Sequence, residues 1–235
     1  MKKYIFLEIP HTNSNPYHNI LLTRYPNKSI FTLNKRENRT TSYFRSLDTS
    51  AKEKYRIIKG IHHFGLHTTF NNPASVQYIT LLRDPIERVI SLYNNIKKNK
   101  THKLHSKIMT QKMSIKDFVG SSLSTELSNY QTSLLSGISF DLDTCNFDIY
   151  SEAKRNLKKH FVHVGIQEYF EDSLTDLQKL VSADSSMTNF NLAKSKTEKN
   201  TIPNTTLDLI HERNIYDIIL YNKQLIKYRK LRKEV

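Results

Sequence analysis

The chain has 235 residues, enough for one domain, and 37% of them are hydrophobic, which is low but sufficient for a core. Its net charge of +14 should attract polyanions such as nucleic acid, acidic glycans, phosphorylated cofactors or anionic membranes. Its five glycines form neither GxGxxG nor GxxxxGK, and a single cysteine, Cys145, excludes an intramolecular disulfide, a CxxC redox site and a zinc site built on several cysteines.

Strand and helix patterns alternate along the chain. Strands are predicted at 4–7, 29–33, 56–58, 76–82 and 161–165, and helices from Pro16, from Pro85 to 96, and at 114–120, 124–136, 150–159, 168–181 and 205–230. Residues 34–50 are predicted to form a mobile polar loop. The alternation predicts one α/β domain over 1–235, with a central parallel sheet flanked by helices and a basic C-terminal helix over about 205–235.

No apolar run is long enough to cross a bilayer as a helix. The apolar stretch at 4–7 meets Glu8 too soon for a signal peptide. These features predict a soluble, cytoplasmic protein. Ligands of parallel α/β sheets bind at the carboxyl ends of the strands, where helix N-termini point their free N–H groups.

The first candidate segment is the polar loop from Pro10 to Asn15, between a predicted strand and a predicted helix. Its amides and the hydroxyls of Thr12 and Ser14 could hold an anion at the helix N-terminus. The alternative is a loop that only caps the helix, as many α/β proteins have.

The second segment runs from Arg83 to Tyr93. Arg83 stands at the carboxyl end of a strand, where its guanidinium suits a phosphate, and Ser91 follows about two helical turns later. In the alternative interpretation Asp84 caps the helix, Arg88 pairs with Asp84, and Ser91 is only a small helix residue.

The third segment, 60–67, holds His62, His63 and His67 after a strand end. These side chains could supply a general base or bind a metal, but no carboxylate converges on them, and a structural role is equally open. The remaining basic segments, at 97–107, 194–199 and 223–233, are most simply solvated faces.

Taken together, these segments resemble the sulfotransferases that use 3'-phosphoadenosine 5'-phosphosulfate (PAPS), in the branch related to heparan sulfate 2-O-sulfotransferase and its bacterial relatives. The matching segments occur in the same order over nearly the whole chain, at 9–12, 60–67, 83–93, 113–119, 129–137, 164–170 and 212–217. The Arg-Asp-Pro segment is the most specific of them.

The resemblance implies a P-loop-like loop that binds the phosphosulfate. Its positions here are Pro10, His11, Thr12, Asn13, Ser14 and Asn15. Arg83 and Ser91 match the residues that hold the 3'-phosphate, and Lys194 and Lys196 loosely match a loop that closes over the nucleotide. His62 or His63 is the expected catalytic base. PAPS is the expected sulfuryl donor, and no metal is required.

The sequence departs from the family pattern in two places. The family loop usually reads Pro-Lys-Thr-Gly-Gly-Thr, whereas His11 stands at the lysine, and Asn13 and Ser14 stand at the glycines. Because histidine must gain a proton to act as a cation, His11 replaces a permanent charge with a conditional one. The base of the relatives often follows the glycine directly, but Ile61 stands there and His62 comes one residue late.

The expected activity is transfer of a sulfuryl group from PAPS to a hydroxyl of an acceptor. The resemblance favours a carbohydrate acceptor, and the positive charge favours an acidic one. Three alternatives remain: a degenerate relative that binds nucleotide or acidic glycan without turnover, a nucleic-acid-binding protein, and a nucleotide kinase. Nucleic acid is not expected as a partner, because no reading motif is present, and a kinase would lack its Walker A loop.

Overall fold

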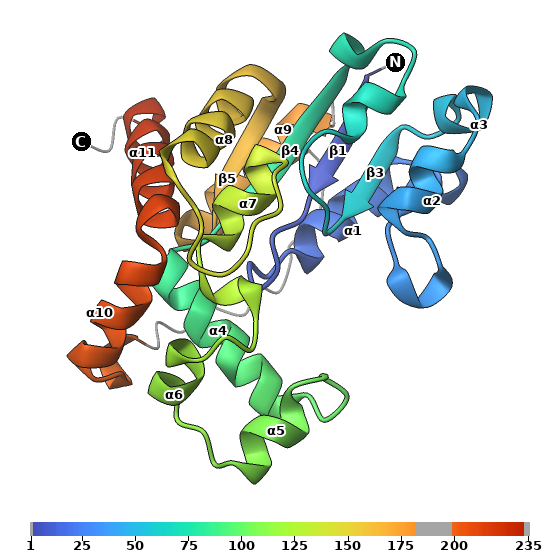
Figure 1. Cartoon of the computed structure of the whole chain (residues 1–235). Helices are drawn as coiled ribbons and strands as arrows, with labels where there is room; N and C mark the ends of the chain where they lie inside the picture. The colour runs from blue at the N-terminus through green and yellow to red at the C-terminus, as the bar shows by residue number, and fades with distance from the viewer. Residues whose placement is uncertain (1, 182–198, 233–235) are drawn as a thin grey trace.

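The computed structural model describes residues 2–181 and 199–232. At its centre is a five-stranded sheet in the order β2-β3-β1-β4-β5, with every strand pair parallel (Figure 1). The strands are β1 (Lys3–Leu7), β2 (Ile30–Thr32), β3 (Ile57–Gly60), β4 (Val76–Leu82) and β5 (Phe161–Ile166). The parallel α/β sheet predicted from the sequence is therefore confirmed.

Helices cover both faces of the sheet (Figure 1). Helices α1 and α9 pack on one face, and α2, α7, α8 and α11 pack on the other. Helices α4, α5, α6 and α10 build a separate apolar cluster. The helices are α1 (Asn15–Arg24), α2 (Thr41–Ser46), α3 (Thr49–Glu53), α4 (Pro85–Lys98), α5 (His105–Thr110), α6 (Ile115–Gly120), α7 (Tyr130–Ser136), α8 (Phe147–His160), α9 (Phe170–Val181), α10 (Asn204–Arg213) and α11 (Ile215–Leu231).

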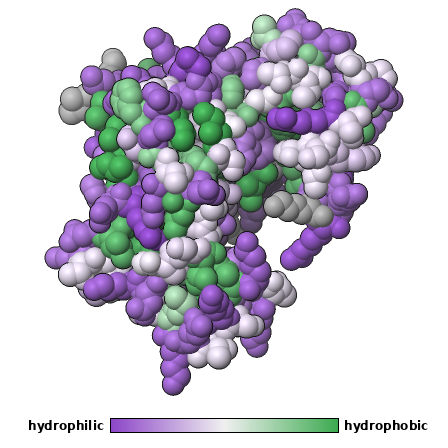
Figure 2. All heavy atoms as spheres, viewed as in Figure 1, coloured by the Kyte–Doolittle hydropathy of each residue, from purple (hydrophilic) through white to green (hydrophobic). Residues whose placement is uncertain are grey.

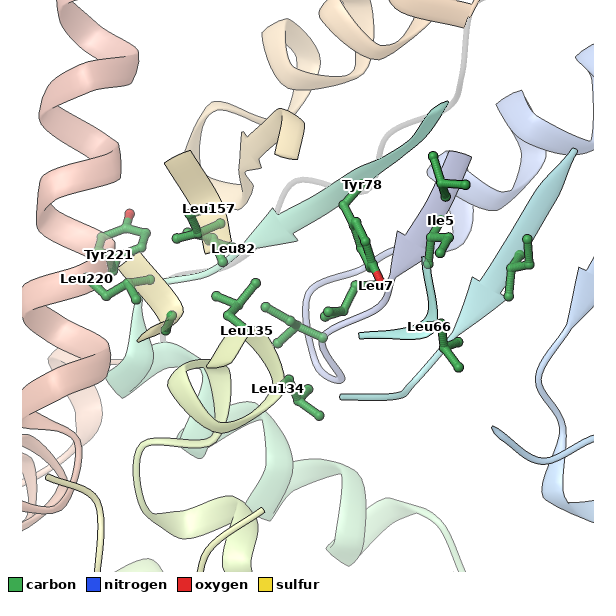
Figure 3. Packing of buried hydrophobic residues seen from close by; sticks show 14 of the residues in the cluster. Ile5, Leu7, Leu66, Tyr78, Leu82, Leu134, Leu135, Leu157, Leu220 and Tyr221 are labelled. Carbon is green, nitrogen blue, oxygen red and sulfur yellow. The ribbon is translucent and has the colours of Figure 1, made fainter. Parts of the chain in front are cut away.

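The inner strands β1 and β3 are buried on both faces, as parallel strands between two helix layers are, whereas Val162 of the edge strand β5 is exposed. Neighbouring side chains on a strand point to opposite faces, so Phe6 and Leu7 of β1 belong to different apolar clusters. Figure 3 shows Leu134 and Leu135 of α7 lying close to Leu7, near the carboxyl end of the sheet. This packing places α7 beside the loops that follow the strands.

Helix α4 begins as its sequence predicts. Pro85 is its first residue, and the side chain of Asp84 accepts hydrogen bonds from two amides of the first turn. Arg88 does not pair with Asp84, however. Its side chain is fully buried, and Nη2 donates to the carbonyl oxygen of Glu126. Arg88 therefore ties α4 to the segment before α7.

The helix predicted over 205–230 is two helices, α10 and α11, which meet at Asn214. The Asn214 side chain explains the break, because its amide donates to the carbonyl oxygens of Leu127 and Ile210 at 2.9 Å each. Its Oδ1 accepts from the amide of Asn129 at 3.1 Å. These contacts join the break to a segment about 85 residues earlier in the chain.

Two other predicted elements also differ. The helix predicted over 124–136 is a 3₁₀ turn, η5 (Thr125–Leu127), followed by α7, because Asn129 between them has a left-handed φ of 46°. The segment 34–50, predicted as a mobile loop, contains α2, which Thr40 caps at the amide of Tyr43. Phe44 of α2 is buried in the core, so packing stabilises this short helix.

Gly165 in β5 has no room for a side chain. A Cβ there would stand 2.0 Å from the hydroxyl oxygen of Tyr17 and 3.0 Å from both Leu81 Cδ1 and Ser173 Cβ. We expect Gly165→Ala to lower the free energy of unfolding by about 1–3 kcal/mol, the range for overpacked cores. Urea unfolding followed by circular dichroism measures the change.

Gly120→Ala at the end of α6 is the matched control, because the nearest atom to its new Cβ, in Leu209, is 4.0 Å away. This variant should unfold at nearly the wild-type urea concentration. Equal destabilisation of both variants would contradict the steric explanation.

Candidate active site

A cavity of about 810 Å³ opens where β1, β2 and β3 end, within the size range of ligand pockets. Figure 2 shows the surface hollowed between the lobe that carries α2 and the helices α4 and α5, with a largely hydrophilic rim. The lining residues are Glu8, Pro10, His11, Leu33, Asn34, Arg39, Thr40, Thr41, Ser42, Arg45, Ile61, His62, His63, Leu66, Asn95, His102, Glu126, Tyr130 and Leu134.

The loop from Pro10 to Asn15 joins β1 to α1 and reaches the cavity through Pro10 and His11. His11 and Asn13 have left-handed φ angles of 68° and 47°, and Ser14 returns to the right-handed helical region. No residue in 2–181 or 199–232 accepts a hydrogen bond from the amides of residues 11–15. Successive free amides at the start of a helix form a concave donor set that suits an anion.

The two hydroxyls of the loop are engaged inside the protein. Thr12 Oγ1 donates to the carbonyl oxygen of Ile9 at 2.7 Å, and Ser14 Oγ donates to the carboxylate of Glu8. The hydroxyl protons are therefore not directed at a ligand. The amides remain as the candidate anion donors of this loop.

His62 and His63 follow β3 and lie in the same cavity. His62 Nδ1 lies 2.8 Å from the carbonyl oxygen of His63, which can only accept, so the proton of the neutral ring is on Nδ1. Nε2 then carries the lone pair, and it is buried with no hydrogen-bond partner among the described residues. Burial lowers the pKa of His62 to about 4. The ring is thus a neutral proton acceptor at neutral pH.

His63 differs from His62 in its contacts. Its Nε2 lies 3.2 Å from Ser133 Oγ of α7, and burial lowers its pKa as well. Ile61, at the position directly after Gly60, also lines the cavity, and 49% of the residue is exposed. Among the described residues, His62 Nε2 is buried without a hydrogen-bond partner, whereas His63 Nε2 lies beside a hydroxyl.

The side chain of His11 faces an acidic group. Its Nε2 lies 3.6 Å from Glu126 Oε2, and His102 lines the cavity beside them. Burial would raise the pKa of Glu126, but the nearby His11 and the charge of Arg88 outweigh it and lower that pKa. Glu126 is therefore a carboxylate at neutral pH, and it competes with any ligand for His11.

Arg83 lies beside the loop rather than in the cavity wall. Its Nη1 donates to the carbonyl oxygen of His11 at 2.9 Å, and its Nη2 lies 3.6 Å from Glu87 Oε2. Its Nε is buried without a hydrogen-bond partner in the described part of the chain. Ser91 is half-buried on α4, one turn before Asn95, which lines the cavity. The fold brings Arg83 to the loop but leaves both Arg83 and Ser91 outside the cavity lining.

The predicted late lysines, Lys194 and Lys196, lie outside the described residues. Lys199 follows them in sequence, and its Nζ pairs with the carboxylate of Asp84. Its amide donates to Glu87 Oε1 at 3.3 Å. Lys199 therefore contacts the first turn of α4, next to Arg83.

Several cavity residues are not predicted from the sequence. Arg39 and Arg45 form part of the wall on the α2 side, and Glu126 and Tyr130 form part of the opposite wall. Arg39 stacks on the ring of Phe31 at 4.3 Å. The Arg45 guanidinium has no hydrogen-bond or ion-pair partner within 2–181 and 199–232. No motif or spacing marks Arg39, Arg45 or Glu126 in the sequence, and Tyr130 lies in the matching segment 129–137 without an assigned role.

Comparison of the chain with models of known protein families gives no match, and a search of curated proteins gives no match either. Among the described residues, no cluster of three histidine, cysteine or acidic side chains is placed to hold a metal ion. Within 2–181 and 199–232, none of the helices has the length and apolar character that crossing a membrane requires.

Proposed function

We propose that the chain is a sulfotransferase that transfers a sulfuryl group from PAPS to a hydroxyl group of an acceptor. The observation that carries this proposal is a single cavity that joins two segments about 50 residues apart in sequence, the loop at Pro10–His11 and the pair His62–His63. A group-transfer site of this kind needs anion donors on the leaving-group side and a base on the acceptor side.

His62 is the proposed base. Its Nε2 takes the proton of the acceptor hydroxyl while the hydroxyl oxygen forms a bond to sulfur. The bond between sulfur and the bridging phosphate oxygen breaks, and the electron pair leaves with the 5'-phosphate of adenosine 3',5'-bisphosphate (PAP). The amides of the P-loop-like loop, together with the His11 side chain, stabilise that leaving phosphate.

Arg83 and Ser91 are the proposed partners of the 3'-phosphate. The buried and unpartnered Nε of Arg83 supports this role, because a guanidinium seldom leaves a buried N–H without an acceptor. Binding energy from this remote phosphate would orient the sulfuryl group for transfer. The closing role of Lys194 and Lys196 stays a prediction from the resemblance.

The proposed acceptor is a carbohydrate, as the resemblance implies, and an acidic one. The cavity wall supports the acidic character, because Arg39 and Arg45 line it on the α2 side. A cytoplasmic location also stays a prediction.

A catalytically inactive relative is the second candidate. It is favoured by Ile61, whose exposed side chain occupies the cavity position where the relatives often have their base. The contact of His11 with Glu126 favours it too, because His11 is the only residue of the loop that could carry a positive charge, and Glu126 competes with a ligand for it.

Calorimetric titration with PAP separates these functions. We expect PAP to bind, and labelled PAPS in a screen of hydroxyl-bearing acceptors to yield sulfated product. Binding of PAP without transfer to any acceptor favours the inactive relative. Absence of PAP binding at pH 6 to 8 would contradict the sulfotransferase and would leave the inactive relative only as a binder of acidic glycan.

A further inference from the structure

A hydrogen-bonded chain of three ionisable side chains lies beneath the loop. Lys59 Nζ is 3.1 Å from His18 Nδ1, and His18 Nε2 is 3.2 Å from Glu8 Oε2. The other carboxylate oxygen, Oε1, accepts from Ser14 Oγ in the loop. An ammonium can only donate, so Nδ1 of His18 accepts, and Nε2 carries the proton that faces Glu8.

The sheet register explains why these groups meet. Lys59 of β3 pairs with Phe6 of β1, and Glu8 follows two residues later, on the same face as Phe6. His18 of α1 covers that face, with its ring 5.2 Å from the ring of Phe6. The chain of contacts therefore links β3, α1, the end of β1 and the loop.

Lys59 is an unusual residue for its position, because only 7% of it is exposed. Burying an ammonium group is costly unless partners compensate for the lost water. Burial lowers the pKa of Lys59, and the charge of Glu8 opposes that shift. Burial would raise the pKa of Glu8, but His18, Ser14 and Lys59 outweigh it and lower the pKa. The carboxylate and the ammonium thus stabilise each other.

Glu8 also lines the cavity, two residues before Pro10, where the loop begins. An uncompensated carboxylate there would repel any anion that the loop amides bind. The loop carries no lysine or arginine of its own, and its His11 faces Glu126. A cation behind Glu8 is therefore needed to keep this side of the cavity suitable for an anion.

We propose that Lys59 is a positioning residue for the anion loop, an inference that rests on the proposed function. Through His18 it neutralises Glu8, and Glu8 in turn holds Ser14 at the start of α1. Ser14 makes no side-chain cap to its own helix, so the first amides of α1 stay free for the ligand.

The test is the affinity for PAP of Lys59→Met, measured by calorimetry beside wild type. We expect about a tenfold loss, the scale of one hydrogen bond to a charged group. Lys3→Met is the matched control. Lys3 is also buried and pairs with Glu53, but it lies at the amino end of β1, away from the loop. The affinity of Lys3→Met for PAP should stay within about twofold of wild type.

Two variants at Glu8 distinguish charge compensation from a merely structural role. In Lys59→Met, adding Glu8→Gln should restore most of the lost affinity, because it removes the charge that Lys59 balances. Glu8→Gln alone should bind PAP more tightly than wild type. This single variant tests the inference even if Lys59→Met fails to fold.

Three results would overturn the inference while the proposed function stands: unchanged PAP affinity in Lys59→Met, no recovery in the double variant, or weaker binding by Glu8→Gln. If wild type binds no PAP, the proposed function falls, and this inference falls with it. The wild-type titration therefore tests the proposed function, and the affinity ratios between the variants test the inference about Lys59.

Discussion

Replacing His62 with alanine should lower kcat by about 10²- to 10⁴-fold, the usual contribution of a general base. His62 has a proton on Nδ1, held by the carbonyl oxygen of His63, and an unpartnered Nε2. The affinity for PAP should barely change, because the ring accepts from the acceptor hydroxyl and not from the nucleotide. Steady-state kinetics and PAP titration measure the two quantities.

His63→Ala is the internal control for this prediction. It removes a neighbouring ring that contacts Ser133, and kcat should fall far less than in His62→Ala. If only His63→Ala loses kcat, the base is the other histidine. If neither variant loses kcat, the base lies outside this loop.

The pH dependence of kcat/KM offers a second measurement on the same residue. Burial holds the pKa of His62 at about 4, so its ring stays neutral and able to accept a proton down to mildly acidic pH. The acid limb of kcat/KM should therefore lie near pH 4 to 5 rather than near the ordinary value of about 6.5. Circular dichroism at each pH must show that the fold persists.

The low pKa also affects stability. The unfolded chain binds a proton at His62 below about pH 6.5, whereas the folded chain resists it until about pH 4. Unfolding therefore takes up a proton in this window, and stability falls as the pH drops through it. His67 and His163, whose pKa values burial also lowers to about 4, add to the same trend.

The strands could be predicted because parallel strands between helix layers are continuous apolar runs, and the segment 76–82 is the clearest case. The start of α4 could also be predicted, since Asp84 caps the first turn of the helix and Pro85 is its first residue. The break at Asn214 was not, because its cause is contacts with Leu127 and Asn129 that lie far away in sequence. A sequence pattern predicts a structural feature only where the residues that cause it are neighbours in the sequence.

The same distinction applies to the candidate site. The approach of His11 and His62 follows from parallel topology, which puts the carboxyl ends of neighbouring strands at one edge. The positions of Arg45 and Glu126 depend instead on how α2 and η5 fold over that edge. Arg88 shows the same limit: its spacing from Asp84 suits a surface ion pair, yet tertiary packing buries it.

Replacing Arg83 with alanine should weaken PAP binding by about 1.5–3 kcal/mol, roughly 10- to 150-fold, the scale of a hydrogen bond to a charged group. Adenosine 5'-phosphosulfate lacks the 3'-phosphate, so its affinity should change much less. Ser91→Ala should act in the same direction with a smaller loss, about 0.5–1.5 kcal/mol, because a neutral hydroxyl donates a weaker bond.

The comparison of the two nucleotides matters because Arg83 has a second role in the structure. Its Nη1 holds the carbonyl oxygen of His11 at 2.9 Å, so the variant also removes a support of the loop. A loosened loop would weaken both ligands equally, since both carry the 5'-phosphosulfate or 5'-phosphate that the loop binds. Equal losses would therefore reject the 3'-phosphate assignment and leave Arg83 as a support of the loop, whereas a loss confined to PAP requires direct contact with the 3'-phosphate.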